Sequence, residues 1–232
     1  MTKFSKNYSR LLNIFFLVYN FINSILLKYK ITVVYHYYTD KELLKLINKL
    51  RSDGDLLLTV NESLQLFECT KSAQKIKGEF AEVGVFRGGS ARLIAEAKGK
   101  RRLYLFDTFE GLPPTEEIDK YVESSSMKAL LDEVKNKLKI FSGIYFYKGL
   151  FQQTSVKIQN KKFAFVHLDA DLFSSTKACL EFFYPRMIKG GIILTHDYPF
   201  MPGVKKAFDN FFKDKKEYII KMVGNQGLVV KL

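Results

Sequence analysis

The chain has 232 residues, of which 47% are hydrophobic and 15% aromatic, and this composition excludes an intrinsically disordered protein. Its formal net charge of +13 favours acidic partners such as an anionic membrane, a charged glycan or nucleic acid, although a lysine-rich genome produces the same excess. Cys69 and Cys179 lie far apart without metal-binding spacing, which predicts a reduced, cytoplasmic protein rather than a disulfide scaffold.

Residues 1–39 form a basic segment that contains no acidic residue and holds +5 of the net charge. Within it, residues 11–27 are the most apolar run of the chain, although they are slightly short for a membrane span of ~20 residues. Their asparagines and serine fall close to one helical face. The pattern therefore predicts an amphipathic helix with a very broad apolar side.

Three roles for this N-terminal helix remain open. Residues 3–30 can lie on an anionic membrane surface, pack against a second subunit, or cover the core of their own chain. We expect subunit or core packing ahead of membrane contact. A cleaved signal peptide is disfavoured because no small-residue cleavage site follows the apolar run.

Two helices are predicted after an extended connector at residues 31–38. Asp40 caps the first helix, and about residues 61–75 form the second. The first helix has an apolar stripe that consists of Leu43, Leu44, Ile47 and Leu50. The chain therefore divides into a basic segment (1–39), a helical cap (40–76) and a main domain (77–232).

From residue 77 onward, short apolar strands alternate with helical stretches. The predicted strands are residues 80–85, 102–107, 144–147, 163–168 and, after a glycine pair, 192–195. The predicted helices are residues 90–97, 124–138, 204–213 and a helix that Ser174 and Ser175 cap and that ends near Arg186. Residues 218–223 and 228–232 form a terminal hairpin. This order predicts an α/β protein with a mostly parallel, seven-stranded sheet and a C-terminal antiparallel hairpin.

Residues 79–97 combine the first strand, a glycine-rich turn and a helix. Gly84, Gly88 and Gly89 allow a ligand to approach bare backbone, and Ser90 stands where free N–H groups favour an anionic group. The spacing G-x-x-x-G-G differs from the dinucleotide fingerprint G-x-G-x-x-G, which disfavours a nicotinamide dehydrogenase. A turn that requires glycine only for its backbone conformation, and that binds no ligand, shows the same sequence pattern.

Polar residues and glycines follow the carboxyl ends of all five parallel strands, where ligands bind in such sheets. Besides the glycine turn, they are Asp107, Lys148, Gly149, Asp169, Asp171 and residues 196–198, and Phe151 follows Gly149 closely. Asp107 is placed to bind ribose hydroxyls or to cap the loop that follows it. Asp169, Asp171, His196 and Asp197 predict either a divalent-cation site or a cation-free acidic rim. His167 and His36 are expected to be structural.

Four ordered motifs carry a family resemblance: E-V-G-V-F-R-G-G-S, F-D-T-F-E-G-L-P, H-L-D-A-D-L-F-S-S-T and Y-P-R-M-I-K-G-G-I-I-L-T-H-D-Y. Over residues 80–212 the chain resembles the macrocin O-methyltransferase family. Members are Rossmann-like, class I enzymes that use S-adenosylmethionine to methylate sugar hydroxyls. The resemblance implies the same fold and activity here, with a sugar or glycan as substrate.

The resemblance also implies roles for individual residues. The implied cofactor residues are Glu82, Gly84, Gly88, Ser90, Asp107, Thr108, Gly149, Phe151 and Asp169. Asp171 matches the family's general base, with Asp169 beside it, while Asp169 and Asp197 match its magnesium ligands. The family usually has two consecutive aspartates where this chain has His196 and Asp197, and imidazole suits manganese, iron or zinc better than magnesium.

Two alternative functions remain. One is methylation of another small hydroxylated acceptor, such as a catechol-like ring. The other is a non-catalytic membrane-associated or nucleic-acid-binding module on the same fold. We expect a homodimeric, cytoplasmic enzyme that uses Mg²⁺ or Mn²⁺ and does not bind nucleic acid. Residues 108–121 are expected to form a lid over the site.

Overall fold

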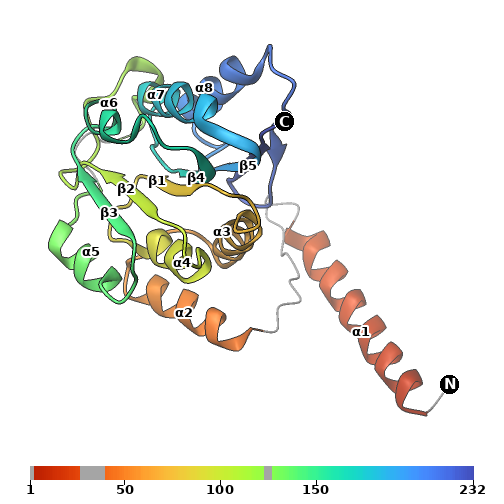
Figure 1. The fold of residues 1–232 in the computed structure, drawn as a ribbon. Helices are drawn as coiled ribbons and strands as arrows, with labels where there is room; N and C mark the ends of the chain where they lie inside the picture. The colour runs from red at the N-terminus through yellow and green to blue at the C-terminus, as the bar shows by residue number, and fades with distance from the viewer. Residues whose placement is uncertain (1–2, 27–39, 123–126) are drawn as a thin grey trace. The chain divides into compact units, whose positions relative to one another are not determined.

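The computed structural model describes residues 3–26, 40–122 and 127–232 (Figure 1). The chain divides into two compact units, Met1–Asp40 and Lys41–Leu232. The two helices expected to form a cap therefore belong to the same unit as the sheet. The extended connector predicted at residues 31–38 lies outside the described residues.

The first unit contains helix α1 (Lys3–Leu26), which begins eight residues before the predicted apolar run. Several of its apolar side chains are more than half exposed, with Leu17 at 70% and Phe21 at 66%. No helix among the described residues has the length and hydropathy that a membrane span requires. An apolar surface of this extent is typical of a segment that contacts a partner.

The second unit is built on a seven-stranded sheet in the order β3-β2-β1-β4-β5-β7-β6. Its strands are β1 (Glu79–Val83), β2 (Leu103–Asp107), β3 (Ile144–Lys148), β4 (Phe163–Leu168), β5 (Met187–Thr195), β6 (Ile220–Lys221) and β7 (Gly227–Val230). The first five strands are parallel, whereas β7 pairs antiparallel with both β5 and β6. The predicted parallel sheet with a terminal antiparallel hairpin is confirmed.

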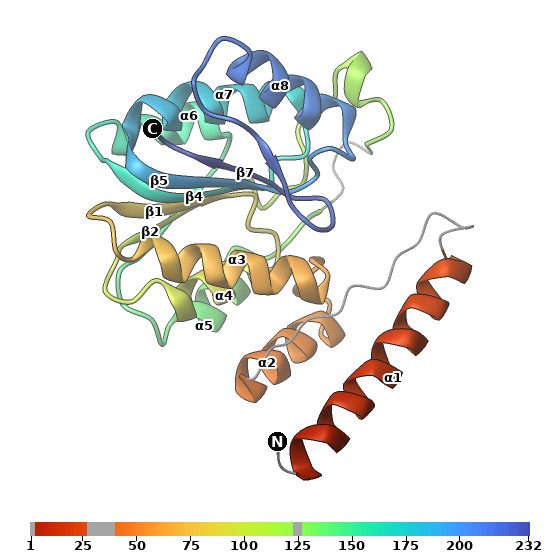
Figure 2. The ribbon, with the colours of Figure 1, turned by 90° about the vertical axis from the view of Figure 1, so that its right-hand side faces the viewer.

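Helices cover both faces of this sheet (Figure 2). One face carries α2 (Lys41–Ser52), α3 (Val60–Ala73), α4 (Gly89–Ala97) and α5 (Leu131–Leu138). The other face carries α6 (Phe151–Thr154), α7 (Phe173–Phe183) and α8 (Pro202–Phe212). Because helices lie on both sides, the central strands are buried on both faces, which is why β4 is a continuous run of six buried residues.

Aromatic side chains fill the layer between β4 and the helices α7 and α8. Phe163 and Phe183 meet edge to face with their ring centroids 5.0 Å apart, and Phe208 packs in the same cluster. All three side chains are completely buried. Burying one such ring contributes roughly 1.5–3 kcal/mol, so this cluster stabilises the packing of α7 and α8 on the sheet.

Several predicted boundaries differ from the structure. β1 ends at Val83 rather than at residue 85, because Gly84 turns the chain with a positive φ of 87°. β5 starts at Met187 and runs through the glycine pair, with an irregular register against β4. Helix α5 starts at Leu131, so residues 127–130 are not helical as predicted; the start expected at residues 124–126 lies outside the described residues.

The predicted cap of α7 was wrong. Ser174 and Ser175 lie inside the helix, whose N-cap position is Leu172 and which has no side-chain cap of its own. Instead, the backbone N–H of Phe173 donates to Asp119 Oδ2 at 2.9 Å. Asp119 belongs to a short 3-10 helix, Glu117–Asp119, far away in the sequence. A distant carboxylate therefore does the work that the local serines were expected to do.

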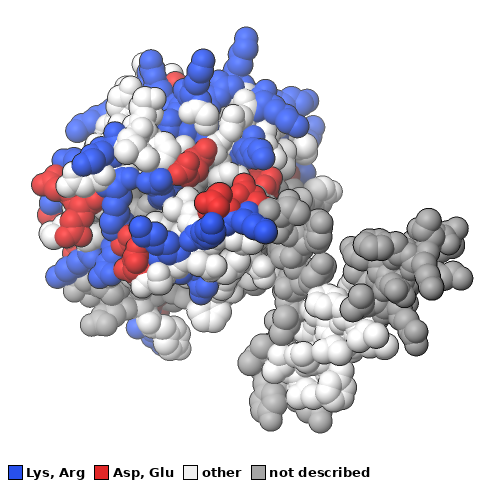
Figure 3. All heavy atoms as spheres, turned by 90° about the horizontal axis from the view of Figure 1, so that it is seen from below, with Lys and Arg blue, Asp and Glu red and all other residues white. Residues whose placement is uncertain are grey.

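Lysine and arginine side chains are spread over much of the surface seen in Figure 3, with acidic side chains between them. Charge of this kind raises solubility and attracts anions in general. On that face the basic side chains do not form a single continuous track.

Candidate functional site

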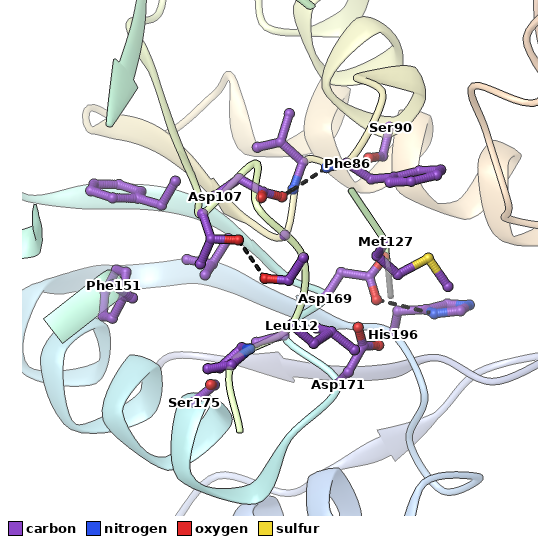
Figure 4. A pocket seen from close by; sticks show the side chains of 18 of the residues that line it. Phe86, Ser90, Asp107, Leu112, Met127, Phe151, Asp169, Asp171, Ser175 and His196 are labelled. Carbon is purple, nitrogen blue, oxygen red and sulfur yellow. Dashed lines mark hydrogen bonds and ion pairs between the residues drawn. The ribbon is translucent and has the colours of Figure 1, made fainter. Parts of the chain in front are cut away.

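A cavity of about 310 Å³ lies at the carboxyl ends of the parallel strands (Figure 4). Most of the predicted site residues line it: Gly84, Ser90, Asp107, Thr108, Gly149, Phe151, Asp169, Asp171, His196 and Asp197. Glu82 and Gly88 are absent from its wall. The edge of the sheet therefore brings together residues that are up to 113 positions apart, from Gly84 to Asp197.

Gly84 is required by close packing as well as by its φ of 87°. A Cβ atom on this residue would lie 1.8 Å from the carbonyl oxygen of Asp169. The backbone after β1 therefore touches the backbone after β4 without any side chain between them. Gly88 has a different function, because its φ of 86° starts helix α4 and its Cβ would meet Val134 at 2.9 Å.

The carboxylate of Asp107 accepts hydrogen bonds from two loops, the one after β1 and the one after β2. Its Oδ2 accepts hydrogen bonds from the N–H groups of Val85 and Phe86 at 2.7 and 2.8 Å. Its Oδ1 accepts from Phe109 N–H at 2.6 Å. Of the two predicted roles, the structure shows loop capping. Each oxygen has two lone pairs, so one acceptor position on Oδ1 is left for a further donor.

Glu82 lies inside the sheet rather than on the cavity wall. Its Oε1 is 2.9 Å from Nδ1 of His167 on the neighbouring strand, and both side chains are fully buried. Burial raises the pKa of Glu82, although His167 and the Ser90 hydroxyl oppose that shift. Among the described residues, Glu82 Oε2 and His167 Nε2 have no hydrogen-bond partner. The structural role expected for His167 thus involves only one of its nitrogens.

His196 sits at the centre of an acidic cluster. Its Nδ1 is 3.3 Å from Asp169 Oδ1 and 3.3 Å from Asp197 Oδ1. Its other nitrogen, Nε2, faces Glu62 Oε1 at 3.7 Å. Burial lowers the pKa of His196, but the three carboxylates outweigh burial and raise this pKa above its ordinary value. The imidazole is therefore held by acids on both of its edges.

Asp171 completes the cluster from the loop after β4. Burial, followed by the charges of Asp169 and Asp197, raises the pKa of Asp171 well above its ordinary value. For Asp169, burial also raises the pKa, but the adjacent His196 outweighs it, and the net shift is downward. The neighbouring carboxyl groups are thereby made unequal, so that Asp169 carries charge while Asp171 is the more basic group.

The donor set fits a divalent cation. Asp169, His196 and Asp197 each offer one ligand atom, and these atoms lie within 4.8 Å of one another. Two carboxylates and one imidazole are suited to manganese, iron or zinc, and the carboxylates alone are suited to magnesium. The same cavity is also lined by the backbone of Gly84 and the apolar side chain of Phe151.

Sequence reasoning missed the contribution of the segment before the sheet. Residues 55–58, between α2 and α3, line the cavity, as do Leu112, Met127 and Ser175. It also missed Glu62, which the acidic motif at the strand ends does not include. One signal was available, because T-x-x-E at Thr59–Glu62 is a capping-box pattern and the structure contains this capping box.

Known proteins resemble the chain in sequence. A family model described as Macrocin-O-methyltransferase (TylF) matches residues 58–227. The 8-demethyl-8-(2,3-dimethoxy-alpha-L-rhamnosyl)-tetracenomycin-C 4'-O-methyltransferase of Streptomyces olivaceus is 29% identical over 154 residues, 59% of each chain. Demethyldecarbamoylnovobiocin O-methyltransferase of Streptomyces niveus is 27% identical over 154 residues, 59% of this chain and 58% of the relative. The match thus spans less than two thirds of either relative.

Solved structures share the fold. The O-methyltransferase NovP superposes with a TM-score of 0.68 at 22% identity, over 79% of this chain and 87% of that one. An O-methyltransferase from Bacillus cereus, solved in complex with SAH, superposes with a TM-score of 0.58 at 14% identity, over 93% and 97% of the two chains. These structures confirm the Rossmann-like methyltransferase architecture. Since the family model covers well over half of the sequence, the chain belongs to the macrocin O-methyltransferase family.

Proposed function

We propose that the protein is an S-adenosylmethionine-dependent O-methyltransferase that acts on a hydroxyl group of a sugar or glycan. The observation that carries this proposal is the shared cavity, in which the glycine turn at Gly84 and the acidic cluster around His196 face the same space. Membership of the family supports a methyl-transfer reaction, and the name of the Streptomyces olivaceus relative describes a rhamnosyl compound.

The glycine turn forms the cofactor side of the proposed site. S-adenosylmethionine supplies the reaction with a methyl group on a sulfonium centre. Gly84 presents bare backbone to the cavity, against which the amino-acid part of this molecule can lie, and Ser90, in the first turn of α4, also lines the cavity. The free acceptor position of Asp107 suits a ribose hydroxyl. Phe151 and Thr108 provide the walls of the pocket for the adenine ring of the cofactor.

The acidic cluster forms the acceptor side. A sugar hydroxyl is barely ionised at neutral pH, so it needs a group that removes its proton as the methyl group arrives. Asp171 is the proposed base, since a carboxylate with a raised pKa accepts a proton more readily than an ordinary one. A positioned base of this kind contributes about 10²–10⁴-fold to the rate.

Asp169, His196 and Asp197 are the proposed ligands of a divalent cation, Mn²⁺ or Mg²⁺. When bound, such an ion lowers the pKa of an acceptor hydroxyl. The three side chains come from the ends of β4 and β5, which pair over Leu168 and Thr195, so the sheet itself sets their separation. Because the strands are buried, the ligands are held on rigid backbone.

Asp171→Asn tests the proposed base. The variant keeps the shape of the side chain and removes its basicity, so we expect cofactor binding to persist while turnover falls about 10²–10⁴-fold. Calorimetry with S-adenosylmethionine measures the first property, and transfer of a labelled methyl group to a panel of glycosides and catechols measures the second.

Ser174→Ala is the matched control, because Ser174 is inside α7, near Asp171 in sequence, and does not line the cavity. Undiminished methyl transfer by Asp171→Asn would rule out this residue as the base. If labelled methyl groups reach catechols but no glycoside, the sugar part of the proposal is wrong while the methyltransferase part stands.

Assembly and location are further parts of the proposal. The exposed apolar side chains of α1, such as Leu17 and Phe21, support packing between two copies in a homodimer. The basic residues of the same segment support contact with an anionic membrane as the alternative. A cytoplasmic location agrees with the two unpaired cysteines, Cys69 and Cys179.

A further inference from the structure

We infer that Glu62 is a positioning residue that orients His196 so that its Nδ1 faces the cation site. The inference rests on the proposed metal site and goes beyond it, because Glu62 belongs to helix α3 and is not one of the proposed ligands. Its carboxylate faces the edge of the imidazole that points away from Asp169 and Asp197, with Glu62 Oε1 3.7 Å from His196 Nε2.

Both oxygens of Glu62 are held in place. Oε2 accepts hydrogen bonds from the N–H and the hydroxyl of Thr59, each at 2.8 Å. Oε1 accepts from the N–H of Asn225 at 2.7 Å, in the turn between β6 and β7. The residue is 2% exposed, so this carboxylate cannot rotate away into solvent.

The turn between β6 and β7 is built to receive this carboxylate. Gly224 has a φ of 86°, and a Cβ atom there would lie 2.4 Å from Glu62 Oε1. The side-chain amide of Gln226 donates through Nε2 to the backbone oxygen of Glu62 at 3.4 Å. A capping box alone needs only the contacts with Thr59. The contacts with the distant turn therefore place the charge at a defined point beside His196.

A fixed carboxylate at one nitrogen decides which nitrogen is free at the other edge of a neutral histidine. With Asp169 and Asp197 bound to a cation, Nδ1 would be the ring nitrogen on the side of those ligands, and Glu62 would be the carboxylate that faces the remaining ring proton on Nε2. Metal-binding histidines commonly donate their second N–H to a carboxylate in this way, and loss of that partner weakens metal binding by about 10–100-fold. His196 is therefore equipped to act as a ligand in a position where the family usually has aspartate.

The test is Mn²⁺ binding to the full chain, measured by electron paramagnetic resonance without any substrate. We expect Glu62→Gln to bind Mn²⁺ about 10–100-fold more weakly than the wild-type protein. Thr59→Ala is the control, since it removes the hydroxyl of the same capping box but leaves the Glu62 carboxylate bound to Asn225. We expect its Mn²⁺ affinity to be unchanged.

Equal affinity in Glu62→Gln and the wild-type protein would overturn the inference and leave the metal site standing. Absence of Mn²⁺ binding by the wild-type protein would overturn both. Methyl transfer by the wild-type protein reports on the proposed function independently of either result. An equal loss in Thr59→Ala and Glu62→Gln would also overturn the inference, because it would show that helix capping is the cause.

A second measurement needs no variant of Glu62 and so does not depend on its folding. Nitrogen-15 NMR of the wild-type protein with Zn²⁺ distinguishes the two ring nitrogens, and the His196 signals are assigned by their loss in His196→Asp. We expect Nδ1 to bind the ion and Nε2 to carry the proton. Coordination through Nε2 would overturn the inference.

Discussion

At the scale of single residues, backbone strain gathers around the cavity. Of the five non-glycine residues with positive φ in the described chain, four line it: Phe86, Met127, Asp171 and Asp197. Aspartate tolerates this conformation, whereas for phenylalanine and methionine it is uncommon. Such conformations persist only where the surrounding structure holds them. Here they direct the carboxylates of Asp171 and Asp197 towards the same space.

His196→Asp tests the choice of metal. The change replaces imidazole with a third carboxylate and restores the aspartate pair that resembles the usual family pattern. We expect the preference to move from Mn²⁺ towards Mg²⁺, since carboxylates suit the harder ion. Methyl transfer measured against the concentration of each ion, with Asp197→Asn as the comparison, gives the result. An unchanged ratio of the two metal affinities would contradict the assignment of His196 as a ligand.

Many of the site residues could be predicted at this scale, and the reason is geometric. Parallel strands end at one edge, so Asp107, Asp169 and Asp197 had to lie at the same edge of the sheet once the strands were identified. Glu62 could not be found in this way, because its helix reaches the site from the face of the sheet. Glu82 was expected at the cofactor, but its strand position places it inside the sheet beside His167.

At the scale of elements, the loop after β2 is anchored by one buried acid. Asp119 is 3% exposed, accepts the N–H of Phe173 at the start of α7, and packs against α8. A Cβ atom on Gly203 would lie 1.9 Å from Asp119 Oδ1, so the fit with α8 leaves no space. The expected lid at residues 108–121 is thus tied at its far end, and any movement must occur between that anchor and Asp107.

Asp119→Ala should lower the free energy of unfolding by about 1–2 kcal/mol, because the first turn of α7 loses its only side-chain acceptor in the described chain. Urea denaturation measures this change. Glu117→Ala, which removes an exposed ion pair with Lys120, is the control and should cost less than about 1 kcal/mol. Equal stability of the two variants would show that Asp119 does not cap α7.

Element boundaries were harder to predict than element types. The strands were recognisable because short apolar runs such as Phe163–Leu168 are typical of strands buried on both faces. The serines in the first turn of α7 were mistaken for caps because a cap from a residue 54 positions away leaves no local pattern. Likewise, Met127 has a φ of 62° and Lys128 forms an isolated bridge with Glu110, contacts that helical periodicity does not reveal.

At the scale of the whole molecule, the last residues of the chain are fastened by Glu217. Its Oε1 accepts from Lys231 Nζ at 2.6 Å, and its Oε2 accepts from the Tyr184 hydroxyl at 2.8 Å. Burial raises the pKa of Glu217, but these hydrogen bonds outweigh it and lower the pKa to about 2. Glu217 therefore joins the segment that follows β7 to the layer of helices that contains α7.

The lowered pKa predicts a dependence of stability on pH. Glu217 contributes its full stabilisation above its ordinary pKa of 4.5, and this contribution is lost as the pH falls towards about 2. Glu217→Gln should lower the free energy of unfolding at neutral pH by about 1.5–3 kcal/mol. Chemical denaturation of both proteins at several pH values should show the difference shrinking in acid. A difference that stays constant with pH would contradict the assigned charge.

The N-terminal unit provides a separate test at this scale. A chain that starts at Lys41 keeps the compact unit with the sheet. We expect it to unfold cooperatively and to bind S-adenosylmethionine like the full chain, but to be monomeric in analytical ultracentrifugation where the full chain is a dimer. A truncated protein that remains dimeric would place the subunit contact elsewhere. Binding of the full chain to anionic vesicles would favour the membrane alternative.

The contact between Glu62 and the turn at Gly224–Asn225 has a consequence for protein synthesis. Asn225 lies in the turn between β6 and β7, and β7 inserts between β5 and β6. A nascent chain whose residues 220–230 are still inside the ribosomal exit tunnel lacks the strand that covers β5 and the Asn225 N–H that holds Glu62. Glu62 can be fixed beside His196 only after this hairpin has emerged and β7 has paired with β5, and until then the nascent chain exposes a strand edge.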